Sequence, residues 1–367
     1  MAPIKSSLAR SAAKLFGVFN QTDLSLRGSK QETRRIFTNA ISATGGQSTF
    51  TQGGYKVHVY YNGTPSPQKV FNVTSGTGDF QIFMVGSGGS GAYDTGGGGG
   101  GGACVYGTDI PADPSMNLTV TVAAAPNAIG GYYSGPETNW RDNYSGKASS
   151  ITHPGGTVIA YGGNSGGAVN AAPYDASPFT PGVAPGSAGV YGSGGGAQRS
   201  SGQGGSDFPV TAGSLRSPYP VPGSGTYNVY RNTGGNVPSS ATAPWVAGGG
   251  GGAGAVGGDA GPRAGHPAQS AGDGGNGYDA ASNIPWMTTS YGDSGVFGGG
   301  GGAGGNDGSP QEPGGAGGTG GGGTGTSSGP GNPGTTNTGG GGSGADDANP
   351  AGAGGSGAVF IAYIPNA

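Results

Sequence analysis

The sequence has 367 residues, of which 91 are glycine, 27 are proline, 32% are hydrophobic and 9% are charged. So few hydrophobic side chains exclude a large conventional core, and such a composition is typical of low-complexity or disordered chains. The net charge is −3, but the chain beyond residue 35 is clearly acidic, which argues against nucleic-acid binding. The single cysteine, Cys104, excludes an intramolecular disulfide. If the glycine runs fold, backbone must pack densely against backbone, because glycine loses more conformational freedom on folding than any other residue.

The first 37 residues are predicted to form a basic anchoring segment. Residues 1–35 carry seven of the 15 lysines and arginines but only two acidic residues, so the rest of the chain is acidic. Apolar residues at three- and four-residue spacing predict a short helix over residues 3–19. A basic arm on an acidic body indicates contact with an acidic surface, although a solvated terminus gives the same pattern. The candidate anchoring residues are Ile4, Leu8, Arg10, Leu15 and Phe16.

Residues 38–54 are polar and are predicted to be a linker. From Tyr55 onward, apolar and polar residues alternate in short runs separated by turn residues, which predicts β-strands. A last apolar run, residues 358–364 (AVFIAYI), can bury its side chains only against these early strands. We therefore predict a mainly β fold, with an antiparallel, jelly-roll-like β-sandwich of residues 55–165 plus 358–367. The early strands are predicted at residues 55–61, 68–73, 80–85, 103–110, 117–123 and 156–161.

Residues 166–357 are predicted to be a large glycine-rich insertion, in which glycine runs alternate with loops that carry the large side chains. An ordered glycine run is expected to adopt polyproline II geometry, with three residues per turn and a rise of ~3.1 Å. Because such rods make no internal hydrogen bonds, their N–H and C=O groups must be paired between rods. The insertion is therefore predicted to be a bundle of polyglycine rods, with the aromatic loops at the rod ends.

No motif makes a convincing catalytic or metal site. Residues 163–167 (GNSGG) fit the G-x-S-x-G pattern, and residues 292–295 (GDSG) are similar to the nucleophile loop of serine proteases. The first pattern needs a strand–turn–helix in an α/β sheet, and both need a positioned base. The three histidines are scattered at His58, His153 and His266, and with one cysteine they form no cluster of metal-ligand spacing. We expect no enzymatic activity, no metal and no cofactor.

Aromatic residues in the loops are the strongest functional signal. All three tryptophans lie outside the predicted strands, among tyrosines and polar residues. Rings offer contact area at low entropic cost and polar neighbours orient a ligand, so these loops suit a sugar or a protein partner. The alternative is that the rings form small cores that fix each loop to the bundle. The candidate ligand-binding residues are Tyr132, Tyr133, Trp140, Arg141, Tyr227, Tyr230, Trp245, Trp286 and Tyr291.

Parts of the chain resemble known phage proteins. Residues 70–123, with FQIFMVGSGGSG and NLTVTVAAAP, and residues 354–364 (GGSGAVFIAYI) resemble the glycine-rich domain of tailed-phage virion proteins. The N-terminal MAPIKSSLARSAAKLFGVF and DLSLRG are similar to the opening segments of structural proteins of marine phages, cyanophages among them. Residues 166–357 resemble the tip adhesins of long tail fibres, in which polyglycine II rods present receptor-binding loops. Unlike those adhesins, this chain carries its own basic N-terminal segment and a flanking sandwich, which leaves room for a capsid-surface location.

The resemblance implies a structural protein on the surface of a phage virion, adhesin-like, that recognises the host surface through its aromatic loops. The implied partners are other virion proteins, bound through residues 1–37, a host cell-surface glycan or protein, and further copies of the chain, with a trimer as the working assumption. No signal peptide or membrane span is predicted, so assembly in the host cytoplasm and release by lysis are expected. The alternatives are a structural component that binds no ligand, such as a capsid decoration or a tail or collar protein, and a depolymerase.

Overall fold

The computed structural model divides the chain into two compact units, Met1–Thr38 and Asn39–Ala367. The first unit, with the five candidate anchoring residues, lies outside the residues that the structure describes. The second unit is mainly β, with antiparallel sheets and one short helix among its described residues, which confirms the predicted fold class. The described residues are 40–62, 69–130, 144–153, 156–167, 192–196, 225–237, 246–262, 269–308, 311–346 and 349–365.

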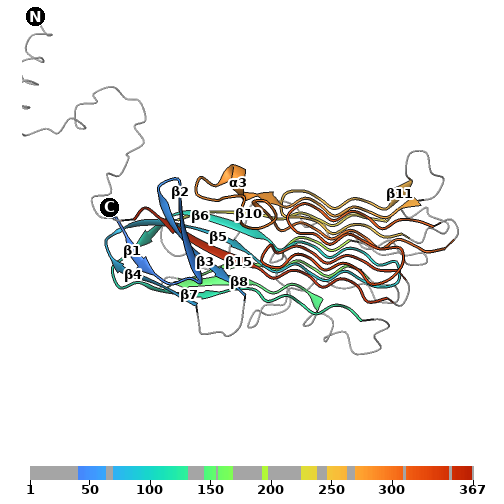
Figure 1. Ribbon diagram of the computed structural model, residues 1–367, viewed down its shortest axis with the longest axis horizontal. Helices are drawn as coiled ribbons and strands as arrows, with labels where there is room; N and C mark the ends of the chain where they lie inside the picture. The colour runs from blue at the N-terminus through green and yellow to red at the C-terminus, as the bar shows by residue number, and fades with distance from the viewer. Residues whose placement is uncertain are drawn as a thin grey trace, which may run out of the picture. The chain divides into compact units, whose positions relative to one another are not determined.

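Two antiparallel sheets contain most of the strands (Figure 1). The five-stranded sheet has the order β1 (Ser42–Thr44), β4 (Lys69–Ser75), β7 (Asn117–Thr121), β8 (Ser149–His153) and β9 (Gly156–Ala160). The six-stranded sheet has the order β10 (Thr226–Tyr230), β6 (Cys104–Ala112), β5 (Gly78–Val85), β15 (Ala358–Tyr363), β3 (Tyr55–Tyr61) and β2 (Ser48–Gln52). Two short pairs complete the set, β11 (Gly261–Pro262) with β12 (Gln269–Ser270) and β13 (Tyr278–Asp279) with β14 (Val296–Phe297).

The last strand, β15, lies in the middle of the six-stranded sheet. It pairs with β3 on one side and with β5 on the other, and all six of its residues are buried. A strand covered on both faces is expected to be a continuous apolar run rather than an alternating one, and AVFIAY has that composition. The expectation that this run packs among the early strands is therefore confirmed.

Several strands lie where the sequence predicted other structure. The linker expected over residues 38–54 contains β1 and β2, and β10 lies inside the expected insertion, where it pairs with β6. β2 is an edge strand with mostly exposed side chains, so it lacks the apolar alternation that would have revealed it. The jelly-roll connectivity stays a prediction.

The two sheets enclose one hydrophobic core, and a second core covers the opposite face of the six-stranded sheet. The first contains Phe71 and Leu118 from the five-stranded sheet and Ile82 and Ile361 from the six-stranded sheet. In the second, alternate residues of β3, β5 and β15 pack against residues 278–297, which include the short helix α3 (Ala280–Asn283). We call residues 278–297 the covering segment. The six-stranded sheet is thus buried on both faces, which a sequence with 32% hydrophobic residues can supply only over a limited area.

Beyond the sheets, the chain forms extended stretches that lie side by side (Figure 1). Strands continue directly into them: β5 runs on into residues 86–92, residues 96–103 lead into β6, and residues 349–357 lead into β15. We call these stretches glycine segments and their assembly the glycine bundle. The glycine segments are residues 86–92, 96–103, 161–167, 192–196, 231–237, 246–254, 256–260, 271–277, 298–305, 312–320, 321–326, 331–335, 338–346 and 349–357.

The glycine segment of residues 96–103 shows how the bundle is joined. Every third N–H group reaches the same neighbour: residues 96, 99 and 102 donate to segment 338–346, residues 97, 100 and 103 to segment 161–167, and residues 98 and 101 to segment 246–254. Its carbonyls accept from three further segments, 86–92, 192–196 and 298–305. A β-strand would alternate with a period of two, whereas a period of three is the repeat of a polyproline II helix.

Most glycine positions inside this arrangement have no room for a side chain. A Cβ atom added to Gly99 would overlap the carbonyl group of Gly89, and one added to Gly301 would overlap that of Gly342. The backbone of Gly99 also donates to Gly342 O and accepts from Gly301 N, each over 2.8 Å. Neighbouring segments therefore approach as closely as hydrogen bonding demands, and only glycine permits that spacing.

Candidate binding surface

The structure describes four of the nine candidate ligand-binding residues: Tyr227, Tyr230, Trp286 and Tyr291. The other five lie outside the described residues, namely Tyr132, Tyr133, Trp140, Arg141 and Trp245. The four described rings belong to the sandwich and its covering segment rather than to the glycine bundle. Each of them can be assigned to packing or to a surface by its contacts.

Trp286 is a core residue. Its side chain is fully buried in the second core, and its Nε1 donates to Gln81 Oε1 over 2.7 Å. The hydroxyl of Tyr106 donates to the same oxygen over 2.8 Å, so one glutamine on β5 holds two aromatic polar groups beneath the covering segment. A buried indole needs such a partner, and one without access to solvent does not meet a ligand. Of the two roles open for this ring, the structure therefore places it in packing.

Tyr230 also contributes to packing. Its ring stacks on Tyr278 with centroids 3.9 Å apart and an interplanar angle of 21°. Burial raises the pKa of Tyr278 above its usual range, and a hydrogen bond with Tyr230 adds to the effect. The pair connects β10 to the covering segment through side chains, because β10 bonds through its backbone only to β6.

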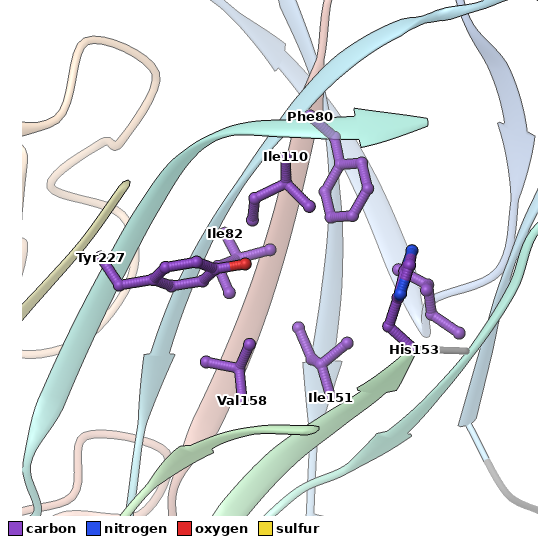
Figure 2. Close-up of a pocket in the computed structure, with 8 residues that line it drawn as sticks. Phe80, Ile82, Ile110, Ile151, His153, Val158 and Tyr227 are labelled. Atoms are coloured by element: carbon purple, nitrogen blue, oxygen red, sulfur yellow. The ribbon is translucent and has the colours of Figure 1, made fainter. Parts of the chain in front are cut away.

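Tyr227 lines a small pocket between the two sheets (Figure 2). The ring points among Ile82, Ile110 and Val158, and its hydroxyl is buried without a hydrogen-bond partner. Burial raises the pKa of Tyr227 to about 12 and lowers that of His153, on which Asp113 has a weaker, opposite effect. The cavity volume is about 10 Å³, room for about one water molecule and far below the roughly 300–1,000 Å³ of ligand pockets. The lining residues are Phe80, Ile82, Ile110, Leu118, Ile151, His153, Val158 and Tyr227.

Tyr291 belongs to a group of partly exposed rings that we call the aromatic patch, formed by Phe50, Tyr61 and Tyr291. Phe50 and Tyr291 stack with centroids 4.8 Å apart and planes at 27°, and Tyr61 lies 6.5 Å from Tyr291. Beneath them, the buried ring of Phe360 meets Tyr291 edge-on at 5.5 Å. Burial raises the pKa of Tyr61 to about 12, and the neighbouring Tyr291 adds to the effect, so the Tyr61 phenol stays neutral in ordinary media.

Exposed polar residues lie within three positions of Phe50 or Tyr291 in the sequence, namely Gln52, Thr289, Ser290, Asp293 and Ser294. Stacked rings bordered by hydroxyl, amide and carboxylate groups can bind a polyhydroxylated or amphipathic partner, with the rings supplying area and the polar groups orientation. The sequence revealed Tyr291 but not Phe50 or Tyr61. Phe50 lies in a polar stretch without alternation, and Tyr61 looks like any strand residue until the fold brings it beside residue 291.

The serines of the two hydrolase-like motifs have structural surroundings. Residues 163–167 form part of a glycine segment, and Ser294 lies in a tight turn with a φ of 54°. The carboxylate of the adjacent Asp293 accepts N–H bonds from Gly320 and Gly321 over 2.8 and 3.3 Å, which ties the turn to the bundle. His58 is buried on β3, where Nδ1 is 2.6 Å from Gly45 O and Nε2 is 3.2 Å from the Tyr363 hydroxyl. Neither hydrogen bond of His58 reaches a serine.

Within the described ranges, no three His, Cys, Asp or Glu side chains gather as metal ligands. The same residues contain no helix that is long and apolar enough to cross a bilayer. Cys104 is buried, its Sγ lies 3.7 Å from Phe297 O, and burial raises the pKa of its thiol, which makes it unreactive.

Comparison with protein-family models finds no match, and a search of curated proteins finds no significant relative.

Proposed function

We propose that this chain is a non-enzymatic structural protein of a tailed-phage virion surface, adhesin-like, in which the glycine bundle stiffens a body that presents the aromatic patch to the host surface. The observation that carries the proposal is the threefold hydrogen-bond pattern of residues 96–103, which joins one glycine segment to six others. That pattern supports a polyglycine II-type scaffold, the architecture that the resemblance to phage adhesins implies.

The cost of ordering the bundle favours a mechanical role. Fixing one residue's backbone costs roughly 1–2 kcal/mol, and glycine lies at the unfavourable end. The chain nonetheless orders glycine in segments that pair with neighbours on several sides, and it joins them to the strands of the sandwich without a break. Such an assembly bends little, so a surface on the sandwich keeps a fixed direction relative to the bundle. Fixed direction is useful for display on a particle and unnecessary for catalysis on a small molecule.

The proposed partners follow from the surfaces. A host glycan or a host protein with exposed sugar would contact the aromatic patch, because rings with hydroxyl, amide and carboxylate groups nearby match sugar faces and edges. Residues 1–37, with their excess of positive charge, would bind another virion protein. Further copies of the chain would complete the assembled form.

Adsorption of phage particles to host cells tests the proposal. We expect the substitution Tyr291→Ser to lower the adsorption rate constant about tenfold or more, since it removes one ring of the stacked pair and loosens the other. The matched control is Trp286→Phe, which alters a ring that is buried and should leave adsorption at the wild-type rate. Particles lacking residues 1–37 of this protein should lack the protein altogether, whereas normal incorporation would contradict the anchoring role.

The second candidate is a structural component that binds no ligand, such as a capsid decoration or a tail or collar protein. It is favoured by the packing roles of Trp286 and Tyr230, since both candidate rings hold layers of the fold together. Wild-type adsorption by particles that carry folded Tyr291→Ser protein would establish this candidate over the first. Release of sugar from host polysaccharide by the purified protein would overturn both.

A further inference from the structure

The surface of the glycine bundle is as regular as its interior. In the segment of residues 312–320, the exposed residues are Pro313, Ala316 and Thr319, and in the neighbouring segment of residues 271–277 they are Asp273 and Asn276. The spacing is three residues in both, as expected where one side of a threefold helix faces solvent. At Ala316 and Thr319 the backbone N–H group has no backbone carbonyl among the described residues to accept its hydrogen bond.

Side chains of the neighbouring segments take the place of the missing acceptor. The N–H of Ala316 donates to Asp273 Oδ1 over 2.7 Å, and the N–H of Thr319 donates to Asn276 Oδ1 over 3.1 Å. The same device recurs one segment further on, where the N–H of Asn236 donates to Asp259 Oδ1 over 2.7 Å. In the interior, the corresponding groups bond to backbone carbonyls, as Gly318 N does to Gly300 O over 2.9 Å.

Proline closes other exposed positions by removing the donor. Pro313 precedes Ala316 and Thr319 at the same three-residue spacing and has no N–H group. None of the three exposed positions of that segment therefore has an unpaired backbone donor. Pro330 and Pro333 are likewise exposed and lie three residues apart. Charge and proline at an exposed edge are the means by which β-sheet proteins prevent further strands from adding.

We propose that Asp259, Asp273, Asn276 and the exposed prolines close the lateral edge of the glycine bundle against a second copy of this chain. A glycine segment has no side chains to distinguish its neighbours, so an open edge would accept any other glycine segment, and the most abundant source is another copy on the same particle. The side-chain oxygens occupy the donors that such a segment would need. If the lateral edges of two copies approached each other, the carboxylates of Asp259 and Asp273 on each edge would also bring like charges together.

The test compares wild-type full-length protein with a double variant that carries both Asp273→Ala and Asn276→Ala. We expect amide exchange at Ala316 and Thr319 to become about tenfold faster, as for the loss of one net hydrogen bond. We also expect the weight-average mass from sedimentation to rise with concentration beyond the wild-type value. The matched control is Asp113→Ala with Asn117→Ala, which removes an exposed Asp and an exposed Asn from the sandwich and should change neither readout.

A folded double variant whose mass follows the wild-type curve, despite faster exchange at both amides, would overturn the proposal. Asp273→Asn separates hydrogen bonding from charge, because it keeps an acceptor oxygen and loses the carboxylate. Wild-type mass for Asp273→Asn supports closure by hydrogen bonding, whereas association as strong as that of the double variant overturns it. If the double variant fails to fold, the same comparison is made with Asn276→Ala alone, which leaves Asp273 in place.

Discussion

In the sandwich, side chains fill the interior and backbone hydrogen bonds join the strands in regular ladders. In the glycine bundle, the backbone fills most of the interior and also makes the hydrogen bonds between segments. The sandwich core uses Phe71, Leu118 and Ile361 to fill the space between two sheets. The glycine segments have almost no side chains to fill space and are joined by N–H···O bonds to neighbours on several sides. The comparison shows that density of packing, rather than hydrophobic content, is what the two regions share.

The two regions also respond differently to sequence change. A hydrophobic core tolerates exchange of one apolar side chain for another of similar volume. Most inward positions of the glycine bundle are glycine, because they face the carbonyls of the next segment. A few inward positions carry buried side chains, mostly small ones such as Ala303 and Ser343, whereas Asp273 and Asn276 lie on the outer faces. The largest effects of single substitutions are therefore expected in the region with the smallest side chains.

The largest effect is expected for Gly99→Ala, a methyl addition inside the glycine bundle. The new Cβ would overlap the Gly89 carbonyl, so two segments must separate, and a row of backbone bonds worth ~1 kcal/mol each is weakened together. We expect a loss of more than about 5 kcal/mol in the free energy of unfolding, or failure to fold, measured by denaturant titration. Gly130→Ala is the control, since nothing lies within 4 Å of a Cβ there, and should change stability by less than about 0.5 kcal/mol. Equal effects for the two variants would contradict the close-packed description of the bundle.

Phe360→Ala probes the sandwich and its connection to the bundle. The ring is fully buried and contacts Phe83 and Phe297 with centroids 6.1 and 5.8 Å apart, so truncation should cost about 3–5 kcal/mol. Because β15 continues from residues 349–357 of the bundle, we expect hydrogen exchange to show the same loss of protection at Gly99 as at strand amides. Unchanged protection at Gly99 would instead show that the two regions unfold independently.

The sequence revealed the sandwich wherever side chains alternate strongly. The predicted strand at residues 55–61 coincides with β3, and the apolar run at residues 358–364 contains β15. It failed for β8, because SSITH contains a single aliphatic residue, and for β10, because the short run TYNVY lies among glycine, proline and polar residues. Position in a sheet depends on partners far away in the chain, and β10 finds its partner β6 more than one hundred residues earlier.

The candidate site was less accessible to sequence reasoning than the fold. Aromatic composition marks Trp286 and Tyr291 equally, yet within the same covering segment the first is buried beside Gln81 and the second lies on a partly exposed patch. Nothing in the local sequence distinguishes the two rings, because burial depends on which residues of the segment face the six-stranded sheet in the folded chain. The acceptor role of Asp273 was equally hidden, since it depends on the register between two glycine segments.

The smallest expected effect is the dependence of the sandwich on pH through His58, to which the glycine bundle should be indifferent. Burial lowers the pKa of His58 below its usual value of 6.5; its hydrogen bond to Gly45 opposes this effect and Lys56 adds slightly to it. The unfolded chain therefore binds a proton before the folded one, so the contribution is fully present above pH 6.5 and is lost as pH falls below it. Between pH 7.5 and 5.5 the loss is at most about 1.4 kcal/mol. Denaturant titrations of wild type and His58→Gln check this: the variant should lose less stability over that interval, and identical losses would show that His58 titrates as an exposed histidine does.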